Sequence, residues 1–493
     1  MWAPKNEIMD DYSIISMKKT FLQCNNSMNG VKPMKVSIFW FRKDLRLFDN
    51  KAFSKCIAET DEILPIYIIE DDCSDPAILS QPRMQFLLAC LEKLRDQLDQ
   101  YKSKLYLFRG NAQKIIKKIC NEVDVGSLYF NRNYEPNEIK RDREIWEYCQ
   151  ATEIECKSYK DLLLHERGEI LKKDKKPYIV FSFYFKKWID LKKEPMEDIK
   201  HFKTANLTGL DNDLLPATKD AFKLKPEQAL GEFLKWKVKD YDINRDYPFM
   251  EGTSRLSTYL RTGLVSIRQV YHAAETLFEN ANDKNITGIE TFIKQLAWRD
   301  FYYQILYYFP YVENGPFNKK FNSLKWENDK RLFKHWCDGA TGFPIVDAGM
   351  RQLNHEGWMH NRLRMITASF LIKDLLINWR WGEIYFKQKL IDYDLPLNNG
   401  GWQWCASTGT DAQPYFRMFN PYTQSKKFDP DGTFIKRYVP ELKNVKGKDI
   451  HQPDKMSQKA QQESNCILGD DYPLPIVDHS KQRKKALERY KNV

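Results

Sequence analysis

The chain has 493 residues and a formal net charge of +11 at pH 7; 42% of its residues are hydrophobic and 29% are charged. This balance is typical of a globular protein, and the length suits roughly two or three domains. No run of about 18 apolar residues occurs, so we expect no membrane span. The ten cysteines include no C-x-x-C pair and the eight histidines are dispersed, which argues against a metal site or a disulfide scaffold. We therefore expect a large cytoplasmic protein whose positive charge suits a polyanionic partner.

The first 35 residues contain five methionines and no clear periodicity, so residues 1–35 are predicted to be a disordered extension. Asp10 and Asp11 argue against a mitochondrial transit peptide, because such peptides are poor in acids. No apolar core of a signal peptide occurs in this region. Met34 is a plausible alternative start.

Between residues 36 and 163, short apolar runs alternate with amphipathic stretches. This alternation predicts right-handed βαβ units and an α/β domain with a parallel, Rossmann-like sheet. No G-x-G-x-x-G follows the first strand, so a standard dinucleotide site is not expected there. The expected strands are 36–41, 63–69, 105–108 and 127–130, and the expected helices are 50–58, 83–98, 112–119 and 137–148.

The pattern changes after this domain. Residues 164–231 carry a lysine-rich run (KKDKK, 172–176) and many Pro, Asp and Asn residues, so they are predicted to form a long inter-domain connector. Residues 232–475 are helical in pattern and predict an all-α domain, and 476–493 predict a basic C-terminal tail whose charged helix face is solvated. The expected helices are 254–262, 266–279, 288–309, 344–355, 360–378 and 381–391.

Three groups of residues in the helical region could bind a ligand, and each also has a purely structural explanation. GTSRLS at 252–257 predicts an anion cradle or an ordinary helix N-cap. Trp358, Asn361 and Met365 would share one helix face beside Arg362, either against a flat polar base or in a core. Asp392 and Asp394, followed by NNGGWQW at 398–404, predict a ligand site or a glycine-rich turn.

Taken together, these segments resemble one protein family. WFRKDLR at 40–46, with Asp49-Asn50, resembles the opening of photolyases and cryptochromes. Residues 343–421 resemble class I cyclobutane-pyrimidine-dimer photolyases almost continuously, and the most specific stretches are MHNRLRM at 359–365 and NNGGWQW at 398–404. The resemblance covers about residues 36–475 and implies an N-terminal antenna domain followed by a helical FAD-binding domain.

The resemblance also assigns roles to individual residues. The contacts to the FAD phosphates and ribitol would come from Tyr241, Thr253, Ser254, Arg255, Leu256 and Ser257. The positions around the flavin ring would be Arg364, Asp392, Asp394 and Asn398. The tryptophan chain that photoreduces FAD would be Trp402, Trp379 and Trp326. The pocket for the dimer would contain Gln295, Trp298, Asn361, Arg362, Met365 and Trp404, with Arg362 and Arg417 on DNA phosphates.

The activity implied is light-driven DNA repair, in which excited reduced FAD gives an electron to a flipped-out pyrimidine dimer in duplex or single-stranded DNA. One residue departs from the class I pattern, because Gln295 stands where a glutamate is usual, and Gln cannot ionise. Gln also occurs there in the 6-4 photolyase and animal cryptochrome branch, but that branch has two histidines in place of Asn361-Arg362. Cyclobutane-dimer repair by a monomer is therefore predicted, and a cryptochrome-type blue-light receptor with little repair activity is the alternative.

The antenna chromophore is less well defined by the sequence. Asn137-Glu138 resembles the pair that contacts folate in methenyltetrahydrofolate-binding members, although a helix start after Pro136 explains it nearly as well. Deazaflavin, FMN or an empty antenna site remain alternatives. A flavoenzyme using a nicotinamide donor would need a glycine fingerprint that the chain lacks.

Overall fold

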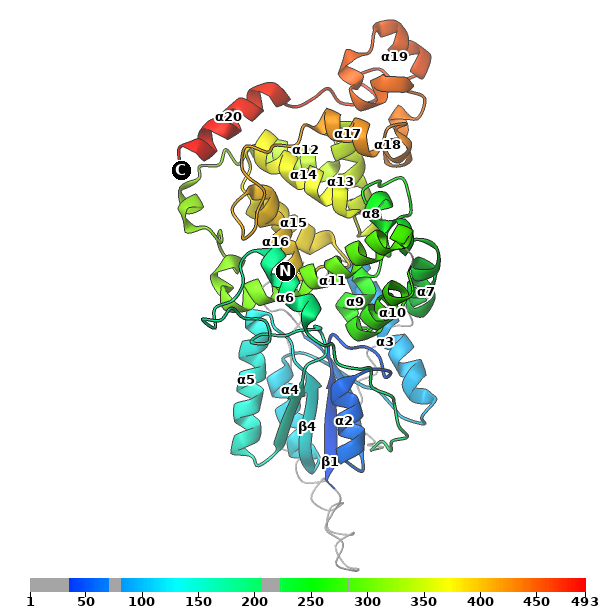
Figure 1. Ribbon diagram of the computed structural model, residues 1–493, viewed down its shortest axis with the longest axis vertical. Coiled ribbons are helices and arrows are strands. Elements are labelled where there is room, and N and C mark those ends of the chain that lie inside the picture. The colour runs from blue at the N-terminus through cyan, green and yellow to red at the C-terminus, as the bar shows by residue number, and fades with distance from the viewer. Residues whose placement is uncertain (1–34, 71–80, 206–221, 223, 282) are drawn as a thin grey trace, which may run out of the picture. The chain divides into compact units, whose positions relative to one another are not determined.

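The computed structural model describes residues 35–70, 81–205, 222, 224–281 and 283–493 (Figure 1). The predicted N-terminal extension, up to residue 34, lies outside these ranges. None of the helices within them has both the length and the apolar character needed to cross a membrane.

The α/β part is built on a parallel sheet with the strand order β3-β2-β1-β4-β5. Alternate residues of β1 face opposite sides: Phe39 and Phe41 pack with α2 and α3, whereas Ile38 and Trp40 pack with α4 and α5. Helices therefore cover both faces, as the alternating pattern predicted. The strands are β1 (Val36–Phe41), β2 (Ile63–Ile69), β3 (Tyr106–Arg109), β4 (Val125–Asn131) and β5 (Glu155–Tyr159), and the helices are α2 (Lys51–Glu59), α3 (Gln81–Asp99), α4 (Ala112–Glu122) and α5 (Pro136–Ala151).

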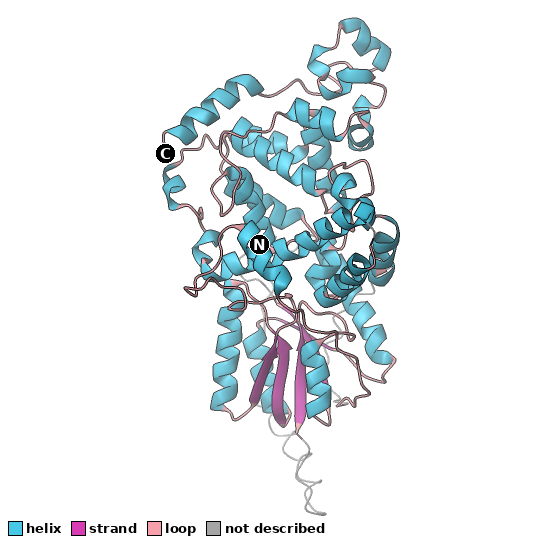
Figure 2. Ribbon diagram, viewed as in Figure 1, coloured by secondary structure: helices cyan, strands magenta, loops and turns pink. Residues whose placement is uncertain are grey.

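The rest of the described chain is helical, as the contrast between magenta strands and cyan helices in Figure 2 shows. Two apolar clusters hold this part together, one around α13 to α18 and one around α6, α10 and α11. The longer helices here are α7 (Pro226–Trp236), α10 (Ile267–Glu279), α11 (Asp283–Tyr308), α12 (Lys330–Asp338), α13 (Pro344–Glu356), α14 (Asn361–Ser369), α15 (Trp379–Lys389), α16 (Leu395–Ala406), α17 (Pro421–Phe428) and α20 (His479–Lys491). The shorter ones are α8 (Tyr241–Asn244), α9 (Ser257–Thr262), α18 (Thr433–Tyr438) and α19 (Gln458–Ser464).

The segment predicted as a connector contains helix α6 (Phe181–Asp190), which belongs to the helical domain. Its residues Phe181, Tyr184 and Trp188 are buried, and the Trp188 indole donates a hydrogen bond of 2.9 Å to Asp300 Oδ2 on α11. The end of the segment forms α7, while residues 206–221 lie outside the described ranges. Only part of the predicted connector is therefore a link between domains.

The basic C-terminal tail is docked on the helical domain by one face of α20. His479 Nδ1 lies 2.6 Å from Asp374 Oδ1, and the Tyr490 hydroxyl donates to the Ala406 carbonyl at 2.7 Å. The lysines and arginines of residues 481–485 are exposed, as predicted for a solvated face.

Several predicted helices differ from the structure in their bounds, and two of these differences affect candidate site residues. The helix expected over 254–262 begins at Ser257, and the one expected over 360–378 ends at Ser369 and continues as a π-helical turn, Phe370–Asp374. Trp358 is not helical, because Gly357 ends α13 with a φ of 63° and His360 caps α14. The prediction that Trp358 shares a helix face with Asn361 and Met365 is therefore wrong.

Candidate functional site

Helix α16 lies at the centre of the candidate site, since it packs against α11, α14 and α15. Its contact with α11 is close at Gly400, where a Cβ atom would lie 2.2 Å from the Tyr302 ring. Both glycines of the motif lie within α16 (Leu395–Ala406), so they form part of a helix and not a turn. The close contact shows that Gly400 is needed for helix packing. Gly401 is different, because it is exposed and a Cβ there would meet nothing within 4 Å, so helix packing does not require a glycine at this position.

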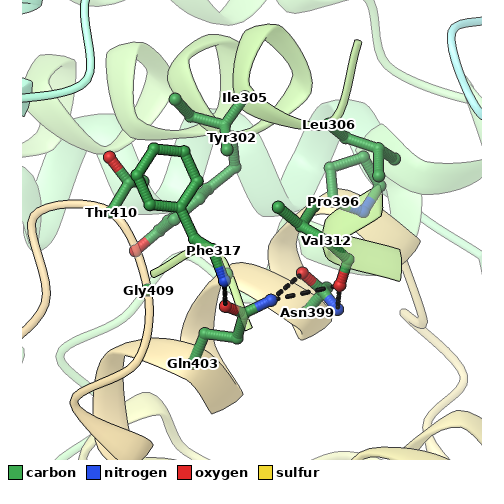
Figure 3. A pocket seen from close by; sticks show the side chains of 11 residues that line it. Tyr302, Ile305, Leu306, Val312, Phe317, Pro396, Asn399, Gln403, Gly409 and Thr410 are labelled. Carbon is green, nitrogen blue, oxygen red and sulfur yellow. Dashed lines mark hydrogen bonds between the residues drawn. The ribbon is translucent and has the colours of Figure 1, made fainter. Parts of the chain in front are cut away.

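Two side chains of the NNGGWQW motif fasten α16 to the segment after α11 (Figure 3). Gln403 Oε1 accepts from the Phe317 N–H at 2.8 Å, and its Nε2 donates to the Val312 carbonyl at 3.1 Å and to Asn399 Oδ1 at 2.9 Å. Asn399 Nδ2 also donates to Val312 at 2.9 Å. The cavity beside them has a volume of about 10 Å³, too small for an organic ligand. These two amides are structural.

The predicted dimer-pocket residues lie on three neighbouring helices: Trp298 on α11, Asn361 and Met365 on α14, and Trp404 on α16. One face of Trp298 is covered by Phe181 of α6, with ring centroids 3.7 Å apart and planes 8° apart. Asn361 is exposed and its Nδ2 lies 3.8 Å from Met365 Sδ. Phe181 was not among the predicted site residues, because it falls in the segment predicted as a connector.

The polar side chains predicted for the dimer pocket and for DNA phosphates differ in the partners that they already have. The Gln295 amide donates to the carbonyl of Thr291, one turn back on α11, at 3.1 Å. Arg362 Nη2 is paired with Asp246 at 2.7 Å and the guanidinium lies over the Phe428 ring, so Asp246 already offsets part of the charge that a DNA phosphate would meet. Arg417 is exposed on the loop after α16.

The predicted flavin-ring residues converge at the start of α16. Arg364 Nη2 donates to both carboxylate oxygens of Asp392 at 3.0 and 2.8 Å, and Asn398 Nδ2 donates to the Glu383 carbonyl at 3.2 Å. Asp394 Oδ2 accepts from the Tyr303 hydroxyl at 2.8 Å. Asp394 Oδ1 is buried without a hydrogen-bond partner among the described residues, and the same holds for Trp402 Nε1 on this helix. These residues fit a bound polar ring system such as the flavin of FAD, because buried polar atoms need partners.

The segment predicted to hold the FAD phosphates is an irregular turn before α9. Ser254 Oγ accepts from the Leu256 N–H at 3.3 Å, and Arg255 has a φ of 50°. The Arg255 guanidinium lies 4.3 Å from the Trp358 ring centroid and 3.3 Å from Glu356 Oε2. The Leu256 side chain is in the core, so only its backbone could contact a phosphate. Tyr241 packs at the edge of the same cluster.

The three predicted tryptophans lie on α15 or next to it. The Trp402 ring lies on Gly382 of α15, where a Cβ would come within 2.0 Å of it. Trp379 is the first residue of α15, and a backbone hydrogen bond of 2.8 Å joins the residue after Trp326 to the segment just before α15. Trp402 and Trp379 are buried, while Trp326 is half-buried. The half-buried Trp326 suits the outer end of a relay that would bring electrons inward to a buried site.

A cavity of about 760 Å³ lies at the carboxyl ends of the strands, between the sheet and α15. Its position beside β1, between strands β2 and β4, is where ligands bind in open α/β sheets. Asn137 and Glu138 line it, and Lys43 Nζ lies 2.8 Å from Glu138 Oε1. Burial opposes ionisation of Glu138, but Lys43 and neighbouring arginines outweigh it and lower its pKa to about 2.

The residues that line this cavity on the side of the helical domain were not among those predicted from the sequence. Arg261, Glu383 and Tyr393 line it, and they are far from Asn137 in the chain. Arg261 Nε donates to the Tyr393 carbonyl at 2.5 Å. Burial raises the pKa of Glu383 to about 7. The Glu383 backbone carbonyl accepts from Asn398 Nδ2, so this side of the cavity connects to the predicted flavin-ring residues.

Comparisons with known proteins agree with this geometry. Residues 37–200 match the family model described as DNA photolyase, and residues 292–492 match the FAD binding domain of DNA photolyase. The chain is 41% identical to the deoxyribodipyrimidine photo-lyase of Alkalihalophilus pseudofirmus, with 92% of this chain and 97% of that protein covered. It is 38% identical to the Escherichia coli photo-lyase, with 93% and 98% covered.

Solved structures show the same fold. A class III photolyase from Agrobacterium tumefaciens superposes with a TM-score of 0.87 at 35% identity, covering 95% of this chain and 99% of that one. A Synechocystis cryptochrome gives 0.80 at 28% identity, covering 94% and 100%. The fold and site define a two-domain, FAD-binding protein of the photolyase and cryptochrome type. The chain belongs to the DNA photolyase family, so the predicted fold class is confirmed.

Proposed function

We propose that the protein repairs cyclobutane pyrimidine dimers in DNA with light, and that the face shared by α11, α14 and α16 holds the lesion. The observation that carries this proposal is the placement of Trp298, Asn361, Met365 and Trp404 on three packed helices, next to the flavin-ring residues of α16. FAD, when bound and reduced, supplies the photoexcited electron that splits the dimer. The chain's own residues bind, orient and shield the reactants.

The lesion would leave the base stack and enter this pocket. Trp298 and Trp404 offer aromatic faces for stacking, and Phe181 stiffens Trp298 from behind. Asn361 would read the polar edges of the bases with its exposed amide. Arg417 and Arg362 would hold phosphates of duplex or single-stranded DNA, so affinity would fall with salt.

The flavin would lie against the start of α16. Asp394 and Trp402 have buried polar atoms that it could satisfy, Asn398 would face its central ring, and the Arg364–Asp392 pair would fix the charge beside it. Tyr241, Thr253, Ser254, Arg255 and Ser257, with the backbone of Leu256, would hold the ribitol and phosphates. Trp402, Trp379 and Trp326 would carry electrons inward.

A second chromophore would occupy the 760 Å³ cavity, whose size suits a cofactor. Asn137 and Glu138 support a methenyltetrahydrofolate there, while deazaflavin or FMN would have to use the same walls. The protein would act as a cytoplasmic monomer.

Repair of a thymine-dimer oligonucleotide by purified, pre-reduced protein, in blue light and in the dark, tests this proposal. We expect repair in light alone. Photoreducible FAD without repair in light would contradict it and favour a blue-light receptor, the alternative that Gln295 supports.

A further inference from the structure

The lysine-rich run of residues 172–176 forms a tight hairpin. Leu171 and Pro177 make an antiparallel bridge, the Lys172 N–H donates to the Lys176 carbonyl at 2.9 Å, and Lys175 turns the chain with a φ of 61°. Residues 173–176 are exposed and Lys172 is half-buried. Four lysines thus share one turn.

Carboxylates neutralise only a small part of the positive charge of this hairpin. Asp174 accepts from the Lys176 N–H at 3.2 Å, and its carboxylate lies 3.5 Å from Lys176 Nζ, so it shapes the turn and offsets one lysine. Across the described ranges, no other carboxylate forms an ion pair with any of the four lysines. The hairpin therefore presents a net charge of about +3 to solvent.

The hairpin is joined to the lesion pocket through residues 178–181. The Ile179 carbonyl accepts from the Thr410 hydroxyl, and the Phe181 N–H donates to Asp411 Oδ2 at 3.0 Å, both on the loop that carries Arg417. Phe181 itself stacks on Trp298. Phe181 follows Lys176 by five positions, so the two Cα atoms lie at most about 18 Å apart. A duplex of that length carries about ten phosphates, at one charge per ~1.7 Å.

We propose that hairpin 171–177 binds phosphates of the DNA backbone on one flank of the lesion. This inference rests on DNA being the substrate. The exposed face of α6 continues the surface with Lys186 and Lys187. Lysines act on phosphate as point charges, so the hairpin adds affinity for any sequence and does not recognise the lesion. An acidic protein partner is disfavoured, because the hairpin is fastened to the elements that hold Trp298 and Arg417.

The test replaces Lys172, Lys173, Lys175 and Lys176 together by Gln. Affinity for undamaged and for dimer-containing duplex is measured from about 0.05 to 0.2 M salt by fluorescence anisotropy. Each lost phosphate contact should flatten the plot of log K against log salt by about 0.9, so a loss of two to three contacts flattens it by roughly 2 to 3. Both duplexes should lose affinity by the same factor, about tenfold or more at low salt, and Lys→Arg at the same four positions should retain it.

The matched control removes the same charge elsewhere, at four exposed lysines of α2, α4 and α5: K55Q, K114Q, K118Q and K140Q. It should keep the wild-type salt slope. An unchanged slope in the hairpin variant, or an equal change in the control, would overturn the inference. Light-dependent repair by the wild type is recorded separately: binding that depends on the hairpin without repair would refute the proposed reaction alone, and repair with an unchanged slope would refute the hairpin alone.

Discussion

Replacing Gly400 by Ala tests whether the close approach of α16 to α11 builds the site. The added methyl would lie 2.2 Å from a Tyr302 ring carbon, whereas ordinary carbon contacts are about 3.5 Å, so the helices would have to separate by about 1 Å or the ring would have to move. Tyr302 also packs against Trp298, with ring centroids 5.4 Å apart, so the shift would reach the proposed lesion pocket.

The magnitude follows from two opposing effects. Ala is better than Gly inside a helix by about 1 kcal/mol, and overpacking a core costs about 1–3 kcal/mol. Gly231→Ala in α7 is the matched control, because its methyl would meet nothing within 4 Å. Gly231→Ala should raise the free energy of unfolding by about 1 kcal/mol. The free energy of unfolding of Gly400→Ala should be about 1–3 kcal/mol lower than that of Gly231→Ala.

Thermal unfolding of both variants measures the stability, and single-turnover repair measures the site. A misplacement of about 1 Å can cost about 100-fold in rate. We expect Gly400→Ala to slow repair toward that extent and Gly231→Ala to leave it at the wild-type rate. A Gly400→Ala variant as stable and as active as Gly231→Ala would refute the packing argument.

Four further outcomes are expected. Trp298→Ala should weaken binding of a dimer-containing duplex by about 1–3 kcal/mol in a titration, and equal affinity would remove Trp298 from the pocket. Trp402→Phe should abolish bleaching of the oxidised flavin absorbance by light and reductant while pre-reduced protein still repairs. The raised pKa of Glu383, about 7, means that its carboxyl takes up a proton on folding between pH 4.5 and 7, so its stabilising effect is lost as the pH rises through that window. Glu383→Gln should therefore unfold near the wild-type melting temperature at pH 5 and above it at pH 8, where the free energy of unfolding should be higher than that of the wild type by up to about 3 kcal/mol. A stability difference between the two proteins that does not change with pH would contradict the raised pKa of Glu383. Gln295→Glu should raise the repair yield per photon if the usual carboxylate assists splitting, and an unchanged yield would show that an amide suffices.

The sheet could be predicted because its strands are short apolar runs between amphipathic helices. Strand β5 could not, because ECKSY at 155–159 is a half-exposed edge strand with little apolar content. Helix α6 was not predicted, because the lysine-rich run before it led the whole segment to be interpreted as a connector. Phe181, Tyr184 and Trp188 nevertheless have the spacing of one helix face.

The residues proposed for the flavin and the lesion came from family motifs, since their chemistry alone was ambiguous. The structure separates roles that the motif NNGGWQW could not: Asn399 and Gln403 fasten α16 to the segment after α11, Gly400 packs α16 against α11, and Trp402 packs on Gly382 of α15. Long-range partners such as Asp246 for Arg362, or Glu383 for Asn398, leave no local signal in the sequence.

The most direct test of the central claim is the wavelength dependence of dimer repair. The rate of repair per incident photon by pre-reduced protein is measured from the near-ultraviolet to the green. It should follow the absorption spectrum of the bound reduced flavin together with that of any antenna chromophore. No repair should occur in the dark. Repair in the dark, or a spectrum unrelated to that of the bound chromophores, would contradict the account.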